Sequence, residues 1–292
     1  MSEHLMRKES PGRALRRVCQ NHAGRALASL QKKKVPQAVH DVRREIKMMR
    51  ALFRLTCGAL RGKEHRKTAR VMRLAAKPLA ASRDARVTRW TFENLVKSKV
   101  RDFPNLRARL QTHASRAERQ LKDFDSGAVA KFILKQVCHQ LEDLGLKRLG
   151  WPDIRAGLEQ SHARGRSAYE LAKLKPSPEN LHEWRKRVKD LWYQMDFLCP
   201  DWPSKTRALL GSLKKLGGEL GRDHDLVLLG RFSQEQCGPS SETARLQELI
   251  EARRKQCGAG IRQLGSRLYA NEPKVVCDQV EKDWKAWRSA KK

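Results

Sequence analysis

Two short segments of the sequence place one histidine and three basic side chains on one side of a helix. The residues are His40, Arg43, Arg44 and Lys47 in the first segment and, 142 residues later, His182, Arg185, Lys186 and Lys189 in the second. At helical spacing each set covers a face about 100° wide, with apolar residues opposite. Arginine offers a planar pair of donors and lysine a compact charge, and both suit phosphate oxygens. The spacing therefore predicts two helical faces that bind an anion.

Each segment is followed by a longer row of positions on one helical face. These rows are Arg66, Arg70, Arg73 and Lys77 in the first half and Arg207, Gly211, Lys214 and Gly218 in the second. A third row, Arg155, His162, Arg166 and Lys173, precedes the second segment. The first two rows each span eleven helical steps, roughly 16 Å, and the two glycines would let a ligand approach the backbone closely. A single charged face is usually only solvated, but recurrence at matching positions favours a binding role.

A second similarity links Leu79–Asp84 with Leu220–Asp225 at a spacing of 141, and it aligns Asp84 with Asp225 and Arg83 with His224. We expect the two aspartates to cap the helices that follow them; orienting a cation such as Arg83 or His224 is the alternative. Arg222, Asp223, His224 and Asp225 also suggest a metal site. The first half has no equivalent cluster and the surroundings are cationic, so no metal is predicted.

The two motif histidines have two open interpretations. Neighbouring cations disfavour the charged form of imidazole, whereas a bound phosphate favours it. His40 and His182 are therefore either direct contacts of a bound phosphate or neutral hydrogen-bonding residues between helices.

The whole sequence predicts an all-α fold, because helix-favouring residues dominate and no sustained alternating pattern occurs. We expect helices at roughly 11–33, 37–57, 63–82, 85–97, 104–123, 127–147, 153–174, 178–199, 204–220, 224–237, 241–269 and 273–289. Pro78 should kink or end the helix that carries Lys77. The repeat divides the chain near Gly150 and Pro152 into two helical bundles, residues 1–150 and 151–292, related by a pseudo two-fold axis.

Composition restricts the possible partners. The 292 residues include 63 Lys and Arg against 32 Asp and Glu, a formal net charge of +31, which calls for a polyanion. Seven cysteines without a CxxC pair indicate a reducing, cytoplasmic compartment. The first residues lack the apolar stretch of a signal peptide, and no apolar run is long enough to span a bilayer. Nucleotide-loop and zinc-protease motifs are absent, so neither a cofactor nor a catalytic activity is expected.

Four segments together resemble the CHAD family, the conserved histidine α-helical domain. They are HDVRREIKMMR at 40–50, LAASRDARV at 79–87, LHEWRKRVKDLWY at 181–193 and LGRDHDLVLL at 220–229. The resemblance implies two four-helix bundles with a basic cavity or groove between them, binding of inorganic polyphosphate and association with polyphosphate granules. Carried over to this chain, it adds Arg50 to the anion site. Trp192 stands where the second motif usually has a base, and its helical phase predicts a core position.

Three other functions compete with polyphosphate binding. The charge suits a non-specific nucleic-acid binder equally well, but few aromatic residues are available to stack on bases. An enzyme acting on phosphoanhydrides would need a carboxylate cluster for Mg²⁺, which the sequence lacks. A membrane-surface protein would flank its basic helices with exposed bulky apolar residues.

Overall fold

The computed structural model describes residues 3–31, 35–60, 62–123, 126–198 and 204–290, and within them it contains helices and no strand. The α-helices are α1 (Pro11–Ser29), α2 (Val35–Phe53), α3 (Lys63–Ala75), α4 (Ala80–Val96), α5 (Pro104–Asp123), α6 (Ser126–Asp143), α7 (Trp151–Leu174), α8 (Pro178–Leu198), α9 (Ser204–Cys237), α10 (Ser241–Leu268) and α11 (Pro273–Ser289). Three short 3-10 helices cover Arg54–Thr56, Lys97–Asp102 and Leu146–Arg148. The predicted all-α class is confirmed.

Local sequence signals account for several helix ends. The Ser240 side chain accepts a hydrogen bond from the Thr243 amide at 3.1 Å and caps α10, and Ser10 caps α1 in the same way. α3 ends at Ala75, shortly before Pro78, as predicted from the fixed proline ring. Lys77 consequently lies in the turn after α3, so its predicted place on the helical row is wrong.

The sequence predicted two helices between residues 204 and 237, but α9 is one continuous helix of 34 residues. Its two ends are fixed in different hydrophobic cores, by Leu213, Leu216 and Leu220 at one end and by Leu226, Leu229 and Phe232 at the other. This packing outweighs the low helix propensity of the glycines between them. Asp225 therefore lies inside α9, and Asp84 lies inside α4, which begins at Ala80. The prediction that both aspartates cap helices is wrong.

Two hydrophobic cores hold the helices together. The larger joins α1, α2, α3 and α6 to α7, α8, α11 and parts of α9 and α10. The smaller lies where α4 and α5 pack on the second half of α9 and the first half of α10, and in it Phe92 and Phe103 meet edge to face at 5.8 Å. Both cores combine residues from either side of residue 150. The equivalence of the two halves in space stays a prediction.

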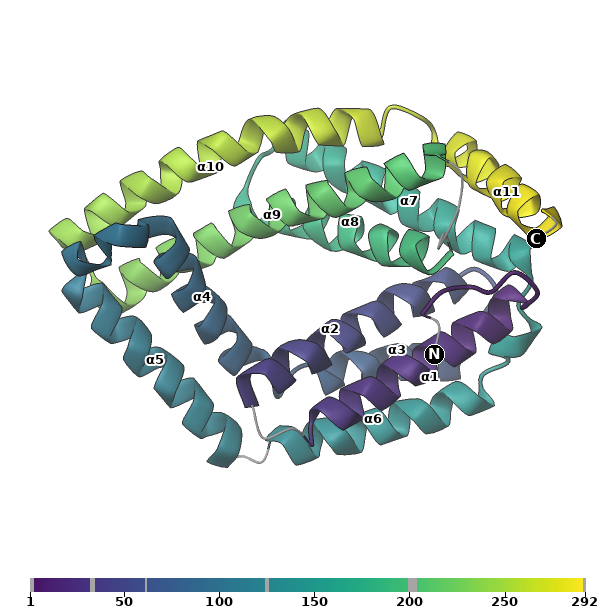
Figure 1. Ribbon diagram of the computed structural model, residues 1–292, viewed down its shortest axis with the longest axis horizontal. Helices are drawn as coiled ribbons and strands as arrows, with labels where there is room; N and C mark the ends of the chain where they lie inside the picture. Colours follow the sequence, from purple (N-terminus) through teal and green to yellow (C-terminus); the bar gives the residue numbers. More distant parts are fainter. Residues whose placement is uncertain (1–2, 32–34, 61, 124–125, 199–203, 291–292) are drawn as a thin grey trace.

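The helices form a frame around the centre of the molecule (Figure 1). α9 and α10 run along one side, α1, α2 and α6 along the opposite side, and α4 and α5 join the two at one end. α2 packs against α8, α8 against α9, and α4 against both α2 and α9. These four helices therefore surround the middle of the frame. Among the described helices, none carries an apolar stretch that could cross a membrane.

Candidate functional site

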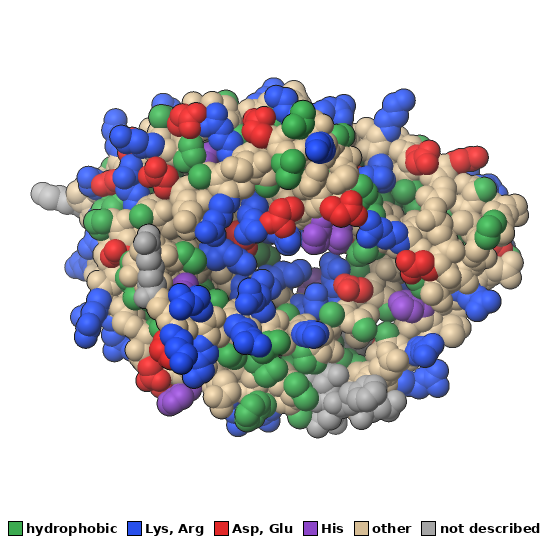
Figure 2. Space-filling model, turned by 180° about the vertical axis from the view of Figure 1, so that it is seen from behind, with side chains coloured by type: hydrophobic (Ala, Val, Ile, Leu, Met, Phe, Trp, Pro, Cys, Tyr) green, Lys and Arg blue, Asp and Glu red, His purple; other side chains and the backbone are tan. Residues whose placement is uncertain are grey.

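A hollow opens at the centre of the molecule, and blue Lys and Arg side chains surround it together with purple histidines (Figure 2). The basic faces of α2 and α8 predicted from the sequence meet here, because Arg185 of α8 lies close enough to Lys47 of α2 to lower its pKa. Arg83 of α4 acts on the same lysine. Lys214 of α9 acts on Lys189 of α8. Four helices thus direct positive charge towards one space.

The pKa values of two lysines reflect the repulsion among these charges. Desolvation, and then the nearby Arg83 and Arg185, lowers the pKa of Lys47 to about 7, although the side chain stays accessible to solvent. Desolvation, followed by the charges of Arg185 and Lys214, lowers the pKa of Lys189 to about 8. Each lysine therefore faces other cations beside protein that desolvates it, an arrangement that an entering anion would relieve.

Two arginines at the hollow keep buried donors without a partner. Arg43 donates from Nη1 to the carbonyl oxygen of Ala76 at 2.9 Å, which anchors it to the end of α3. Its Nε, and the Nε of Arg185, are buried and have no hydrogen-bond acceptor among the described residues. Buried donors are normally satisfied, and an unsatisfied one costs about 1–3 kcal/mol. A bound oxyanion would accept these hydrogen bonds.

Two aspartates orient Arg83 within the cluster. Arg83 donates to Asp84 at 2.9 Å and forms a longer ion pair with Asp225 at 3.9 Å. Burial raises the pKa of Asp225, while Arg83 and Arg185 oppose that rise. The aspartates therefore perform the alternative role considered from the sequence, which is to orient a cation.

The histidines of α8 and α9 lie against each other, with the ring centroids of His182 and His224 4.1 Å apart. Burial, followed by the charges of His182 and Arg185, lowers the pKa of His224 to about 3. Burial also lowers the pKa of His182, and its Nδ1 has no partner among the described residues. His40 of α2 is largely exposed, and partial desolvation of its ring lowers its pKa as well. All three rings are therefore neutral near pH 7.

A second group of charges continues the basic face of α2 away from the centre. Arg54 donates to Asp190 of α8 at 3.1 Å, and this pair joins the 3-10 helix at the end of α2 to α8. Burial, and then the charge of Arg54, lowers the pKa of Arg50, which also lies near Arg73 of α3. The predicted residues Arg50 and Arg73 are thus adjacent, at the edge of the cluster.

Two glycines that the sequence did not single out shape the α9 wall. A Cβ atom on Gly217 would lie 3.1 Å from Cε of Lys189, and one on Gly221 would lie 3.4 Å from Nε of Arg185. Their absent side chains let both cations lie flat against α9. Gly211 and Gly218, which were expected to admit a ligand, face open space, because a Cβ atom added to either would have no neighbouring atom within 4 Å. The four-residue spacing of Gly217 and Gly221 is the signal that could have revealed the pair.

Several predicted residues are engaged away from the central cluster. Arg44, Lys186, Arg222 and Arg166 form ion pairs with Glu45, Glu183, Glu219 and Glu272, respectively. The side chains of Arg66, Arg70 and Arg207 are exposed, and no contact within the described part of the chain joins them to the cluster. The row on α7 also fails as a continuous face, because His162 is buried against Tyr269 with ring centroids 5.3 Å apart.

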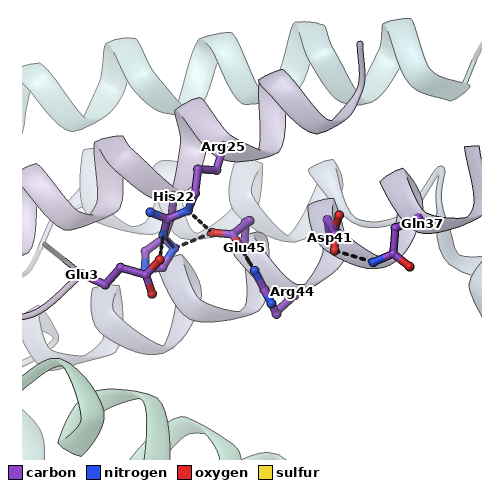
Figure 3. A network of polar contacts seen from close by, with 7 residues as sticks. All are labelled: Glu3, His22, Arg25, Gln37, Asp41, Arg44 and Glu45. Atoms are coloured by element: carbon purple, nitrogen blue, oxygen red, sulfur yellow. Dashed lines mark hydrogen bonds and ion pairs between the residues drawn. The ribbon is translucent and has the colours of Figure 1, made fainter. Parts of the chain in front are cut away.

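The ion pair of Arg44 belongs to a buried network between α1 and α2 (Figure 3). Glu45 accepts hydrogen bonds from Arg25 at 3.0 Å and Arg44 at 2.9 Å, and it lies 2.6 Å from Nδ1 of His22. Burial raises the pKa of Glu45, but hydrogen bonds from His22 and Arg44 outweigh it and lower the pKa to about 2. This network holds the rear of α2 while its other face meets the hollow.

Trp192 occupies the predicted core position and also contacts a cation of the site. The indole packs against the larger core, as its helical phase predicted, but it remains partly exposed. Nζ of Lys189 lies 4.4 Å from the centroid of the ring. A cation–π contact of this kind contributes about 0.5–1 kcal/mol, so Trp192 holds the lysine in place where the first motif has Arg50.

The fold and this cluster define a class of protein: an all-α frame whose helices gather cations around a central hollow. The chain belongs to the CHAD domain family, which it matches over residues 12–234. It is also similar to the crystal structure of the CHAD domain from the plant Ricinus communis, with a TM-score of 0.60 and 18% identity. That match covers 97% of this chain and 94% of the plant chain, and at this identity it concerns the fold alone. No curated protein matches the sequence.

Proposed function

We propose that this protein binds inorganic polyphosphate in the central hollow and catalyses no reaction. The observation that carries the proposal is the convergence of Lys47, Arg83 and Arg185 from three helices. Their charges repel one another in the free protein, and the buried Nε of Arg185 has no acceptor among the described residues. A ligand rich in anionic oxygens relieves both costs at once.

The side chains of the site favour polyphosphate over nucleic acid. Polyphosphate is a thin chain of closely spaced charges without bases, so cations alone are enough to hold it. Stacking on aromatic side chains contributes much of the affinity for single-stranded nucleic acid. Trp192, an aromatic side chain at the cluster, is occupied by Lys189 and by the core.

A pair of matched double variants tests the ligand. Arg43→Ala with Arg185→Ala removes two donors inside the hollow, and each hydrogen bond to a charged group contributes about 1.5–3 kcal/mol. We expect polyphosphate affinity to fall at least about a hundredfold, with binding of DNA at low salt nearly unchanged. The control, Arg44→Ala with Lys186→Ala, removes the same charge from the neighbouring positions that are paired with glutamates. Equal losses for both ligands would instead favour non-specific nucleic-acid binding.

The absence of catalysis is part of the same proposal. It is supported by the lack of a carboxylate group suited to holding Mg²⁺: among the described residues, no three metal-binding side chains of His, Cys, Asp or Glu come together. Incubation with polyphosphate and Mg²⁺ or Mn²⁺ should release no more phosphate than a blank. Sustained turnover that is lost on changing Asp84, Asp223 or Asp225 would overturn this part.

We also propose that the protein associates with polyphosphate granules in the cytoplasm, as its family membership suggests. A fluorescent fusion should co-localise with granules and should disperse in cells that cannot make polyphosphate. The variant with both Arg43 and Arg185 replaced by alanine should disperse as well. A fusion that stays on granules with this double change would separate granule association from the central hollow.

A further inference from the structure

α3 carries a row of cations that neither the hollow nor any ion pair of the described residues uses. Arg66, Arg70 and Arg73 are exposed and share one face of the helix. In the described part of the chain, no carboxylate lies within ion-pair distance of them. Arg44 and Lys186 differ, because each is paired with a neighbouring glutamate. The row on α3 thus presents its full charge to solvent.

The row costs α3 stability without any local compensation. α3 has 13 residues and one acidic residue, Glu64. The Oε2 atom of Glu64 lies 3.9 Å from Nζ of Lys67, so this carboxylate pairs with a lysine and not with the arginines. Like charges three or four residues apart, such as Arg66 and Arg70, destabilise a helix by a few tenths of a kcal/mol per pair. Like charges that destabilise a helix without a compensating contact are expected at positions that serve binding.

One end of the row, at Arg73, lies beside the central cluster. α3 runs back along α2, because His65 stacks on Phe53 with ring centroids 4.4 Å apart and Arg43 bonds to Ala76 at the other end. Arg73 lies near Arg50, which in turn lies near Arg43. An anionic chain that leaves the hollow past Arg50 would therefore meet the α3 row next.

We propose that α3 is an outer track for the part of a polyphosphate chain that extends beyond the hollow, so that affinity increases with chain length. The proposal rests on the proposed function of the hollow. Tripolyphosphate is short enough to be held by the central cluster alone, whereas a long chain also occupies Arg66 and Arg70. The two ligands should therefore respond differently to a change on α3.

The test compares two double variants that lose the same charge. Arg66→Gln with Arg70→Gln removes the outer two of the three arginines and leaves Arg73 beside Arg50. Lys255→Gln with Arg262→Gln is the control, because both residues are exposed on α10, on the opposite side of the frame. Affinities for tripolyphosphate and for long-chain polyphosphate are measured by calorimetry across a salt series. For the long chain, we expect the slope of log affinity against log salt to be shallower by about two in the α3 variant than in the control. Tripolyphosphate binding should stay equal to that of the control.

Two results would overturn the proposed outer track. In the first, the α3 variant binds the long chain with the same affinity and salt slope as the α10 control. In the second, the α3 variant loses as much affinity for tripolyphosphate as it loses for the long chain. Failure of the proposed function is distinguishable, because in that case neither phosphate ligand would bind the unchanged protein more tightly than DNA does. Thermal unfolding completes the experiment: removing like charges from α3 should leave the Tm unchanged or higher, so weaker binding cannot be assigned to unfolding.

Discussion

Replacing Lys189 with methionine should stabilise the free protein while weakening its affinity for polyphosphate. The lysine is charged at neutral pH although desolvation and the positive charges of Arg185 and Lys214 disfavour that form. Together they lower its pKa from 10.5 to about 8. A difference of this size corresponds to about 3 kcal/mol of cost for the charged form. Methionine keeps most of the stem that packs on Gly217 but loses the cation–π contact with Trp192, worth about 0.5–1 kcal/mol. We expect a net gain of about 2 kcal/mol at pH 7.

The pH dependence of this gain follows from the direction of the pKa shift. Lys189 binds its proton less tightly in the folded protein than in the unfolded chain, so its cost is fully present below about pH 8. The cost disappears as the pH rises to 10.5, the value expected for the unfolded chain. The advantage of Lys189→Met over the unchanged protein should therefore be largest at neutral pH and vanish across this interval.

Urea unfolding at several pH values measures the effect, with Lys186→Met as the control on the same helix. Lys186 is exposed and paired with Glu183, so its replacement should leave stability unchanged or slightly reduced. If Lys189→Met proved less stable than the unchanged protein at pH 7, or if its gain did not depend on pH, the electrostatic account of the hollow would be refuted.

Three further predictions concern the walls and supports of the site. Gly217→Ala should weaken polyphosphate binding, because the new Cβ would displace a cation, whereas Gly218→Ala should leave binding unchanged and stabilise α9 by about 0.5–1 kcal/mol; calorimetry and thermal unfolding separate the two. Polyphosphate affinity should increase as the pH falls from about 7 to about 5, because a bound anion raises the lowered pKa of His182, of His224 and of Lys47. A variant with both histidines changed to glutamine should lose most of the increase below about pH 6 and keep the part near pH 7 that Lys47 supplies. Glu45→Gln should destabilise the fold by about 3 kcal/mol in urea unfolding at pH 7, and the deficit should shrink as the pH falls below 4.5 towards 2, where the carboxylate becomes protonated in the unchanged protein too.

Much of the fold and the centre of the site could be predicted from the sequence. Helical periodicity gave the all-α class, and the predicted bounds of α5 and α11 are those observed. The spacing of Arg43 and Lys47, and of Arg185 and Lys189, places each pair on one helical face, and the structure brings these two faces together. Periodicity reports which side of a helix a residue occupies, and this was sufficient here.

The remainder depended on contacts between distant segments. The continuous α9 was missed because local signals such as Gly218 suggested a break, while its stabilising contacts lie in two separate cores. Arg44 shares the basic face of α2, but a buried carboxylate next to it, held by residues of α1, draws it away from the hollow. The role of Asp225 as a partner of Arg83 likewise requires knowing that α4 packs on α9.

Competition between polyphosphate and RNA across a salt series tests the central claim most directly. All polyanions bind so basic a chain in dilute buffer, because the release of counterions drives association. We predict that polyphosphate displaces bound RNA at physiological salt and shows the steeper dependence on salt, since more cations contact it within the hollow. Equal competition and equal salt slopes for the two polymers would contradict the claim and would identify a general polyanion-binding surface.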